Sequence, residues 1–232
     1  PYPYQAEFLR QAYTPRRIIL KARQTGFSQA FALEALYKAI KIPELTILLV
    51  SRSQELATNL LRYCYLTYNG LRDAPGLVKA NEGEMGFDNG SRIKSIPANR
   101  STGRGFSATD AYLDEFAFAE YAEDIYQSVV PAVAHGGRLT IASTPNGVNN
   151  LFHELYLTGD SFSRLCVPWH ECPAYWTDEE KAQGLPKEES AWYQRERPKY
   201  TAQQWASEYE CDFVGSGEAV FKLEDLDAAE QG

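Results

Sequence analysis

The chain has 232 residues, 44% of them hydrophobic and 23% charged, which is ordinary for a globular protein and long enough for one sizeable domain. No apolar run approaches the roughly 20 residues of a membrane-spanning helix, and the four cysteines are too few and too scattered for a disulfide framework. The net charge of −8 argues against a general nucleic-acid coat, but residues 1–169 hold 17 Lys/Arg and 16 Asp/Glu, whereas residues 170–232 hold 6 and 15. A nucleic-acid-binding face is therefore compatible with the body of the chain.

The first two thirds of the sequence predict alternating strands and helices. Arg16–Ala22 is a short apolar run, and Ser28–Ile40 has apolar residues at helical spacing, at positions 32, 33, 36 and 40. Leu45–Ser51 is apolar throughout, as expected of a strand buried on both faces. Ser53–Asn69 opens with the Ser and Glu of a helix cap.

The pattern continues with a hairpin and two more buried strands. Gly86–Ile96 contains an Asn-Gly turn between two short runs, which is typical of a hairpin. Asp110–Phe118 and Arg138–Pro145 are predicted strands, separated by the helical segment Glu123–Ala134. Such alternation predicts an α/β fold, with a mostly parallel sheet covered by helices.

From Trp169 onward the composition changes, because Pro, Trp and Tyr become frequent and the helical segments are short and polar. We expect Trp169–Cys211 to be a small helical subdomain, so that residues 1–168 form the core, 169–214 a lid and 215–232 a linker. Few basic residues interleave with the four tryptophans, so we expect these rings to pack the lid rather than stack on bases.

The segment KARQTGFS, between the first predicted strand and helix, has the outline of a phosphate-binding loop, G-x-x-x-x-G-K-[ST]. Phe27 occupies the place of the lysine. A loop that leads into a helix presents backbone N–H groups to an anion, and Ser28 is placed to ligate Mg²⁺. The candidate nucleotide contacts of the loop are Gln24, Thr25, Gly26, Phe27 and Ser28. Taken alone, the segment could equally be a plain turn with a helix cap.

Two other predicted strands end in polar side chains. One ends in Asp114, expected to hold Mg²⁺ through its water shell, and Glu115, expected to deprotonate the attacking water. The next ends in Ser143 and Thr144, whose hydroxyls could sense the γ-phosphate of ATP. Each could instead be an ordinary strand exit. Three strand ends that meet at one crevice of a parallel sheet favour an ATP and Mg²⁺ site.

In order and spacing these segments resemble the ATPase domain of large terminase subunits, the motors that package DNA into tailed-phage and herpesvirus heads. The resemblance covers residues 4–217 and rests on RQTGFS, AYLDE, IASTPNG, the Gly103-Arg104-Gly105 element and YECDFVGS. It implies a RecA-like P-loop core with a lid, and ATP hydrolysis that moves double-stranded DNA into a procapsid in the host cytoplasm. The implied partners are a portal protein, a small terminase subunit and, in a homo-oligomeric ring, further copies that make a pentamer.

The resemblance also implies a C-terminal nuclease of ribonuclease-H-like fold. The sequence ends soon after the linker-like Gly215-Ser216-Gly217, so we expect it to lack that domain and its nuclease activity. The acids of the last segment, KLEDLDAAE, are expected to lie on a solvated helix. The isolated domain could be a monomer.

The missing lysine leaves the phosphate charge to be compensated by other residues. Lys21 stands where the first loop glycine belongs, and the resemblance matches Arg23 to the arginine common in terminase loops. Our hypothesis is that Lys21 replaces the usual lysine and that Arg23 contacts the γ-phosphate. The competing idea, a degenerate site that does not hydrolyse ATP, is disfavoured because Asp114 and Glu115 are both intact.

Several residues keep two interpretations. Arg104 would reach the γ-phosphate of a neighbouring subunit in a ring or be a surface arginine, and Arg100 is the nearest competitor for that role. Gln5 resembles the adenine-reading glutamine of helicase-like ATPases but could be an ordinary polar residue. For the whole chain, a DExx-type helicase and a docking scaffold that does not hydrolyse ATP are the alternatives.

The cysteines raise the question of zinc. Cys166, His170 and Cys172, with the more distant Cys211, would supply suitable ligand types. The spacing C-x5-C lacks the short knuckle of structural zinc sites, so we favour ordinary buried thiols.

Overall fold

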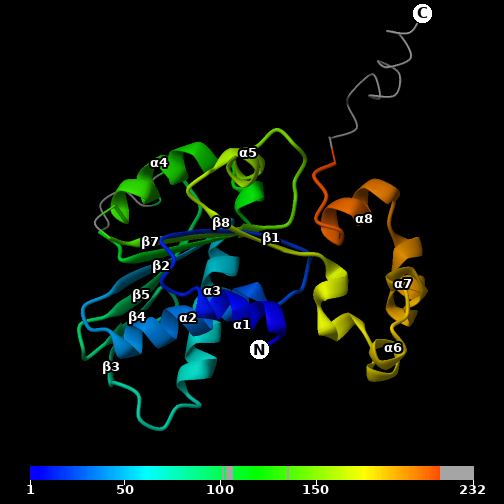
Figure 1. Ribbon diagram of the computed structural model, residues 1–232. Coiled ribbons are helices and arrows are strands. Elements are labelled where there is room, and N and C mark those ends of the chain that lie inside the picture. Colours follow the sequence, from blue (N-terminus) through cyan, green and yellow to red (C-terminus); the bar gives the residue numbers. More distant parts are fainter. Residues whose placement is uncertain (101, 103–106, 135, 215–232) are drawn as a thin grey trace, which may run out of the picture.

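The computed structural model describes residues 1–100, 102, 107–134 and 136–214, and its core is an eight-stranded sheet (Figure 1). The strand order is β3-β4-β5-β2-β6-β7-β1-β8. The strands are β1 Arg16–Lys21, β2 Thr46–Ser51, β3 Leu77–Ala80, β4 Glu84–Phe87, β5 Arg92–Pro97, β6 Asp110–Asp114, β7 Arg138–Ser143 and β8 Ser163–Val167. Six of them run parallel, and β3 and β4 are antiparallel additions at one edge. The predicted fold class is confirmed.

Helices cover both faces of this sheet. In Figure 1, α1, α2 and α3 lie on one face, and α4 and α5 lie on the other. The helices are α1 Pro3–Arg10, α2 Phe27–Lys41, α3 Gln54–Tyr68, α4 Ala122–Ala132, α5 Leu151–Thr158, α6 Asp178–Gln183, α7 Ala191–Glu196 and α8 Ala202–Glu208. Covering both faces explains the sequence of the central strands, because β2 and β6 are buried along their whole length.

The strand predicted over Asp110–Phe118 is too long. β6 ends at Asp114, and Glu115 adopts a left-handed backbone with φ of 56°. The next three residues, Phe116–Phe118, form one turn of 3-10 helix, with Phe116 buried in the core. A left-handed residue costs roughly 1–2 kcal/mol, and here it ends the strand so that the Glu115 side chain stands at the edge of the sheet.

The hairpin around Asn89 and Gly90 is confirmed, since it joins the antiparallel strands β4 and β5, with Gly90 at a φ of 84°. Four elements have no counterpart among the predicted ones: α1, β3, α5 and β8. The edge strand β8 pairs with β1, but its sequence SRLCV alternates half-buried and exposed residues and carries no apolar run.

The segment 169–214 forms short helices beside the core (Figure 1). Trp169 is fully buried at its centre, with the rings of Trp192, Trp176 and Trp205 at 4.8, 5.8 and 6.0 Å between centroids. The expectation that these tryptophans pack the lid is confirmed. Glu210 accepts hydrogen bonds from the indole N–H groups of Trp169 and Trp205, at 2.9 and 3.0 Å.

Some predictions fall outside the described residues, namely Arg104 with Gly103 and Gly105, and the linker 215–232. Within the described part of the chain, none of the helices combines the length and apolar character needed to cross a membrane.

Candidate active site

The three predicted strand ends meet at one edge of the sheet. β7 lies between β1 and β6, with Ser143 aligned to Leu20 and Ala142 aligned to Asp114. Lys21 therefore ends the strand on one side of Ser143, and Asp114 ends the strand on the other. The loop that leads from β1 into α2 lies at the same edge, as the sequence predicted.

The loop fits a phosphate in its backbone but not in its lysine slot. Gln24 and Gly26 have positive φ values of 54° and 76°, and α2 begins directly after Gly26, at Phe27. The Phe27 side chain is 1% exposed and packs against Tyr4 and Phe8, with ring centroids at 5.6 and 5.8 Å. Its side chain therefore belongs to the core, and only its backbone can face a nucleotide.

The positive charge of the site comes from Lys21. Its side chain is buried, with 5% of the residue exposed, and Nζ donates to Glu115 Oε1 at 2.8 Å. Burial lowers the pKa of Lys21, but the charges of Asp114 and Glu115 outweigh this effect and raise it above the usual value. Lys21 is thus a permanently charged ammonium between two carboxylates.

A second pair provides oxygen ligands. Ser28 Oγ, in the first turn of α2, donates to Asp114 Oδ2 at 2.6 Å. Burial raises the pKa of Asp114, and Glu115 adds to this, whereas Lys21 and the Ser28 hydrogen bond oppose it. A hydroxyl beside a carboxylate is a donor set that fits Mg²⁺, which takes one or two protein oxygens and keeps several waters.

Glu115 faces a cavity of about 300 Å³. Its backbone N–H donates to Asp114 Oδ1 at 3.1 Å, which keeps the two acids in a fixed relation. Of the two predicted hydroxyls, only Thr144 lines this cavity. Ser143 is fully buried and its Oγ accepts from the N–H of Ala117 at 3.2 Å, so the expectation that it faces the γ-phosphate is wrong.

The chain was compared with known families and structures. The family model described as terminase large subunit, T4-like-virus type, N-terminal, matches residues 18–228. The chain belongs to the large terminase subunit family. The order of loop, acidic strand and hydroxyl-bearing strand found here is therefore that of a terminase N-terminal domain.

Solved structures share the fold. The large terminase ATPase domain of Thermus phage P74-26 superposes with a TM-score of 0.70 at 18% identity, over 92% of this chain and 94% of that one. The large terminase of a thermophilic bacteriophage gives 0.71 at 12% identity, over 97% of this chain and 57% of that one. That of bacteriophage HK97 gives 0.57 at 16% identity, over 99% and 47%. The chain thus spans about half of the two longer terminases, and the RecA-like class is confirmed.

Arg23 of this terminase chain is exposed over 57% of its side chain and lies 3.4 Å from Glu208 Oε2. The lid holds its backbone: Arg23 N–H donates to Glu208 O at 2.9 Å, and Tyr175 OH donates to Arg23 O at 2.8 Å. Arg23 also lines the cavity at Glu115. Its place is compatible with the predicted γ-phosphate contact, which stays a prediction.

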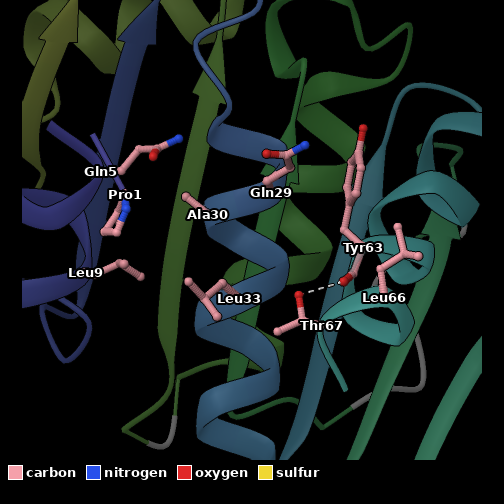
Figure 2. A pocket seen from close by; sticks show the side chains of 9 residues that line it. All are labelled: Pro1, Gln5, Leu9, Gln29, Ala30, Leu33, Tyr63, Leu66 and Thr67. Atoms are coloured by element: carbon pink, nitrogen blue, oxygen red, sulfur yellow. Dashed lines mark hydrogen bonds between the residues drawn. The ribbon is translucent and has the colours of Figure 1, made fainter. Parts of the chain in front are cut away.

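Gln5 braces the loop from α1. Its amide Nε2 donates to Thr25 O and Gly26 O at 3.3 and 3.1 Å, and a Cβ on Gly26 would lie 2.6 Å from that nitrogen. Gln5 also lines a cavity of about 390 Å³ over α2, between α1 and α3, where Figure 2 shows it opposite Tyr63. Adenine reading by Gln5 stays a prediction for this terminase.

Four residues that line the cavity at Glu115 were not identified from the sequence: Arg52, Leu56, Phe118 and Glu208. Arg52 had a signal, because it directly follows the buried strand Leu45–Ser51 and so belongs to the carboxyl edge of the sheet. Glu208 had none, since it comes from the lid.

The described residues contain no cluster of three or more His, Cys, Asp or Glu side chains that could hold a metal ion, in agreement with the preference against zinc. One part of that interpretation is wrong: Cys166 is exposed, whereas the other three cysteines are buried. β8 is the edge strand, so its side chains have no second helix layer over them.

We expect Cys166 to be the reactive thiol of the chain. A hydrogen bond from Cys211, helped by one from Tyr156, lowers the pKa of Cys166 to about 7 against the effect of burial. Iodoacetamide should therefore alkylate Cys166 with a half-maximal rate near that pH, as measured by mass spectrometry, and react slowly with Cys64 and Cys172. Stoichiometric protection of Cys166 and Cys172 by Zn²⁺ would instead restore the zinc interpretation.

Proposed function

We propose that this chain is the ATP-hydrolysing motor domain of a phage large terminase, and that hydrolysis drives double-stranded DNA into a procapsid. One observation carries the proposal: Lys21–Glu115 at 2.8 Å and Ser28–Asp114 at 2.6 Å meet where a phosphate loop opens α2, in a chain of the terminase family. One of the thermophilic bacteriophage terminases was solved with ATP-γ-S, which supports a nucleotide as the ligand.

The residues fit a site for ATP with Mg²⁺. Ser28 and Asp114 would hold the metal, and Lys21 would supply charge to the phosphates. When bound, Mg²⁺ bridges the β- and γ-phosphates and neutralises part of their charge. The backbone N–H groups from Gln24 to Ser28 would surround the phosphates at the N-terminus of α2.

Glu115 is the base in this proposal. It takes a proton from the attacking water while the water oxygen bonds to the γ-phosphorus and the bond to the ADP oxygen breaks. A carboxylate that accepts from Lys21 at 2.8 Å is a weakened base. We infer that Lys21 moves onto the phosphates when ATP binds, and that this move frees Glu115 to act.

The assembly follows from family membership. The proposed partners are double-stranded DNA, a portal protein, a small terminase subunit and further copies of the chain in a pentameric ring, in the cytoplasm of the host. In that ring Arg104 would reach the γ-phosphate of a neighbour. A helicase and a non-hydrolysing scaffold are not favoured by the family match.

Phosphate release from ATP by the purified chain tests the proposal. We expect turnover that requires Mg²⁺ and stops when EDTA removes the metal, because the described residues offer only Ser28 and Asp114 as metal ligands beside the loop. Glu115→Gln should keep ATP-γ-S binding and lose turnover. If the wild-type chain released no phosphate even with procapsids, small subunit and double-stranded DNA, the proposed activity would be refuted.

A further inference from the structure

Arg52 lies beside the base without having been assigned a role. β2 pairs with β6 so that Ser51 is aligned with Asp114. Arg52 is the next residue after Ser51, as Glu115 is after Asp114, and both therefore stand one step beyond neighbouring strands at the carboxyl edge. Lys21 and Thr144 end the strands on the other side of β6 and complete the same edge.

Both residues line one cavity of about 300 Å³. Its polar side chains are Glu115, Thr144, Arg23, Glu208 and Arg52, and Leu56 and Phe118 make the apolar wall. The volume suits a phosphoryl group with its attacking water, and it opens directly beside the carboxylate proposed as the base.

The other charges of this cavity already have partners. Glu115 pairs with Lys21 at 2.8 Å, and Glu208 pairs with Arg23 at 3.4 Å. Within the described part of the chain, Arg52 makes no hydrogen bond or ion pair, and its guanidinium carbon lies 5.7 Å from the ring centroid of Phe118. An aromatic face orients a guanidinium without neutralising its charge.

We propose that Arg52 is a further catalytic residue, and that its guanidinium binds the γ-phosphoryl oxygens on the side opposite Lys21. The reaction spreads charge over three equatorial oxygens of that group, and a planar fork of N–H donors stabilises it there. The inference rests on the proposed function. A phosphate of the DNA backbone shares this chemistry, but the base Glu115 and the hydroxyl of Thr144 share the cavity with Arg52, and this favours the nucleotide.

Nucleotide affinities separate a γ-phosphate contact from a structural role. Arg52→Ala should weaken binding of ATP-γ-S by roughly 10- to 100-fold and leave ADP binding unchanged, since the lost bond is to the γ-group alone. Turnover should fall by roughly 10²- to 10³-fold, as when one charged donor is removed. Arg52→Lys should recover part of the ATP-γ-S affinity, and Arg52→Gln, with a similar stem, should behave like Arg52→Ala if folding is intact by thermal melting.

The matched control is Arg62→Ala, because Arg62 is also exposed but lies on α3 at a different cavity. It should match wild type in both affinities and in turnover. Equal loss of ATP-γ-S and ADP binding in Arg52→Ala and Arg52→Gln would overturn the inference. Lost DNA binding with unchanged nucleotide discrimination would also overturn it and assign Arg52 to the DNA backbone. A wild-type chain that binds no ATP-γ-S would refute the proposed function itself, and this inference with it.

Discussion

Lys21→Met should reduce ATP turnover by roughly 10³-fold, because it removes the charged donor nearest the proposed phosphates. Met keeps the length of the buried stem, so the change isolates the charge. Without the ammonium, Asp114 and Glu115 would face the triphosphate unneutralised, and we expect binding of ATP-γ-S to weaken as well. Lys21→Arg should not recover the activity, since a guanidinium does not fit the buried space of this ammonium.

Two comparisons make this result specific. Lys41→Met removes an exposed lysine at the far end of α2 and should leave turnover unchanged. Arg23→Ala should cause a smaller loss than Lys21→Met, because the Arg23 side chain is largely exposed and only loosely paired with Glu208. Near wild-type turnover in both Lys21→Met and Arg23→Ala would refute the hypothesis that these residues replace the loop lysine.

Glu34→Gln should lower the free energy of unfolding by about 3–5 kcal/mol, because it leaves two buried cations without their shared partner. Arg17 binds both Glu34 oxygens, at 2.6 and 3.0 Å, and Lys38 Nζ lies 2.7 Å from Glu34 Oε1. All three side chains are nearly completely buried. Urea denaturation followed by circular dichroism measures the change.

The same network positions the active site. Lys38 also contacts Asp110 at 2.9 Å, and Arg138 binds both Asp110 oxygens, at 2.8 and 3.0 Å. It thereby ties α2, which carries Ser28, to the strands that end in Lys21 and Asp114. The matched control is Glu7→Gln, whose pair with Arg10 is exposed and should not move the midpoint. A Glu34→Gln protein as stable as wild type would show that the network contributes nothing net to folding.

Apolar runs made the core of the fold predictable. β1, β2, β6 and β7 are buried on both faces, and their sequences show it without any long-range information. The strand ends could be placed for the same reason, since parallel strands leave their polar ends at one edge. β8 and β3 escaped prediction because edge strands are polar on one face and short.

The face of α2 could not be read correctly from periodicity. The apolar positions predicted to face inward include Leu33, which is 38% exposed, whereas the charged Glu34 and Lys38 are buried. Their burial depends on Arg17 and Asp110, which lie far away in the sequence. For the same reason the location of the missing charge was a choice between Lys21 and Arg23, and only the fold shows that Lys21 points at Glu115.

The most direct test of this account is a crystal structure of the chain with Mg²⁺ and ATP-γ-S, and the decisive quantity is the position of Lys21 Nζ. We expect Nζ to leave Glu115 and to lie about 3 Å from a β- or γ-phosphate oxygen, with Ser28 and Asp114 at the metal. A complex in which Lys21 still pairs with Glu115, while other cations alone contact the phosphates, would contradict the account.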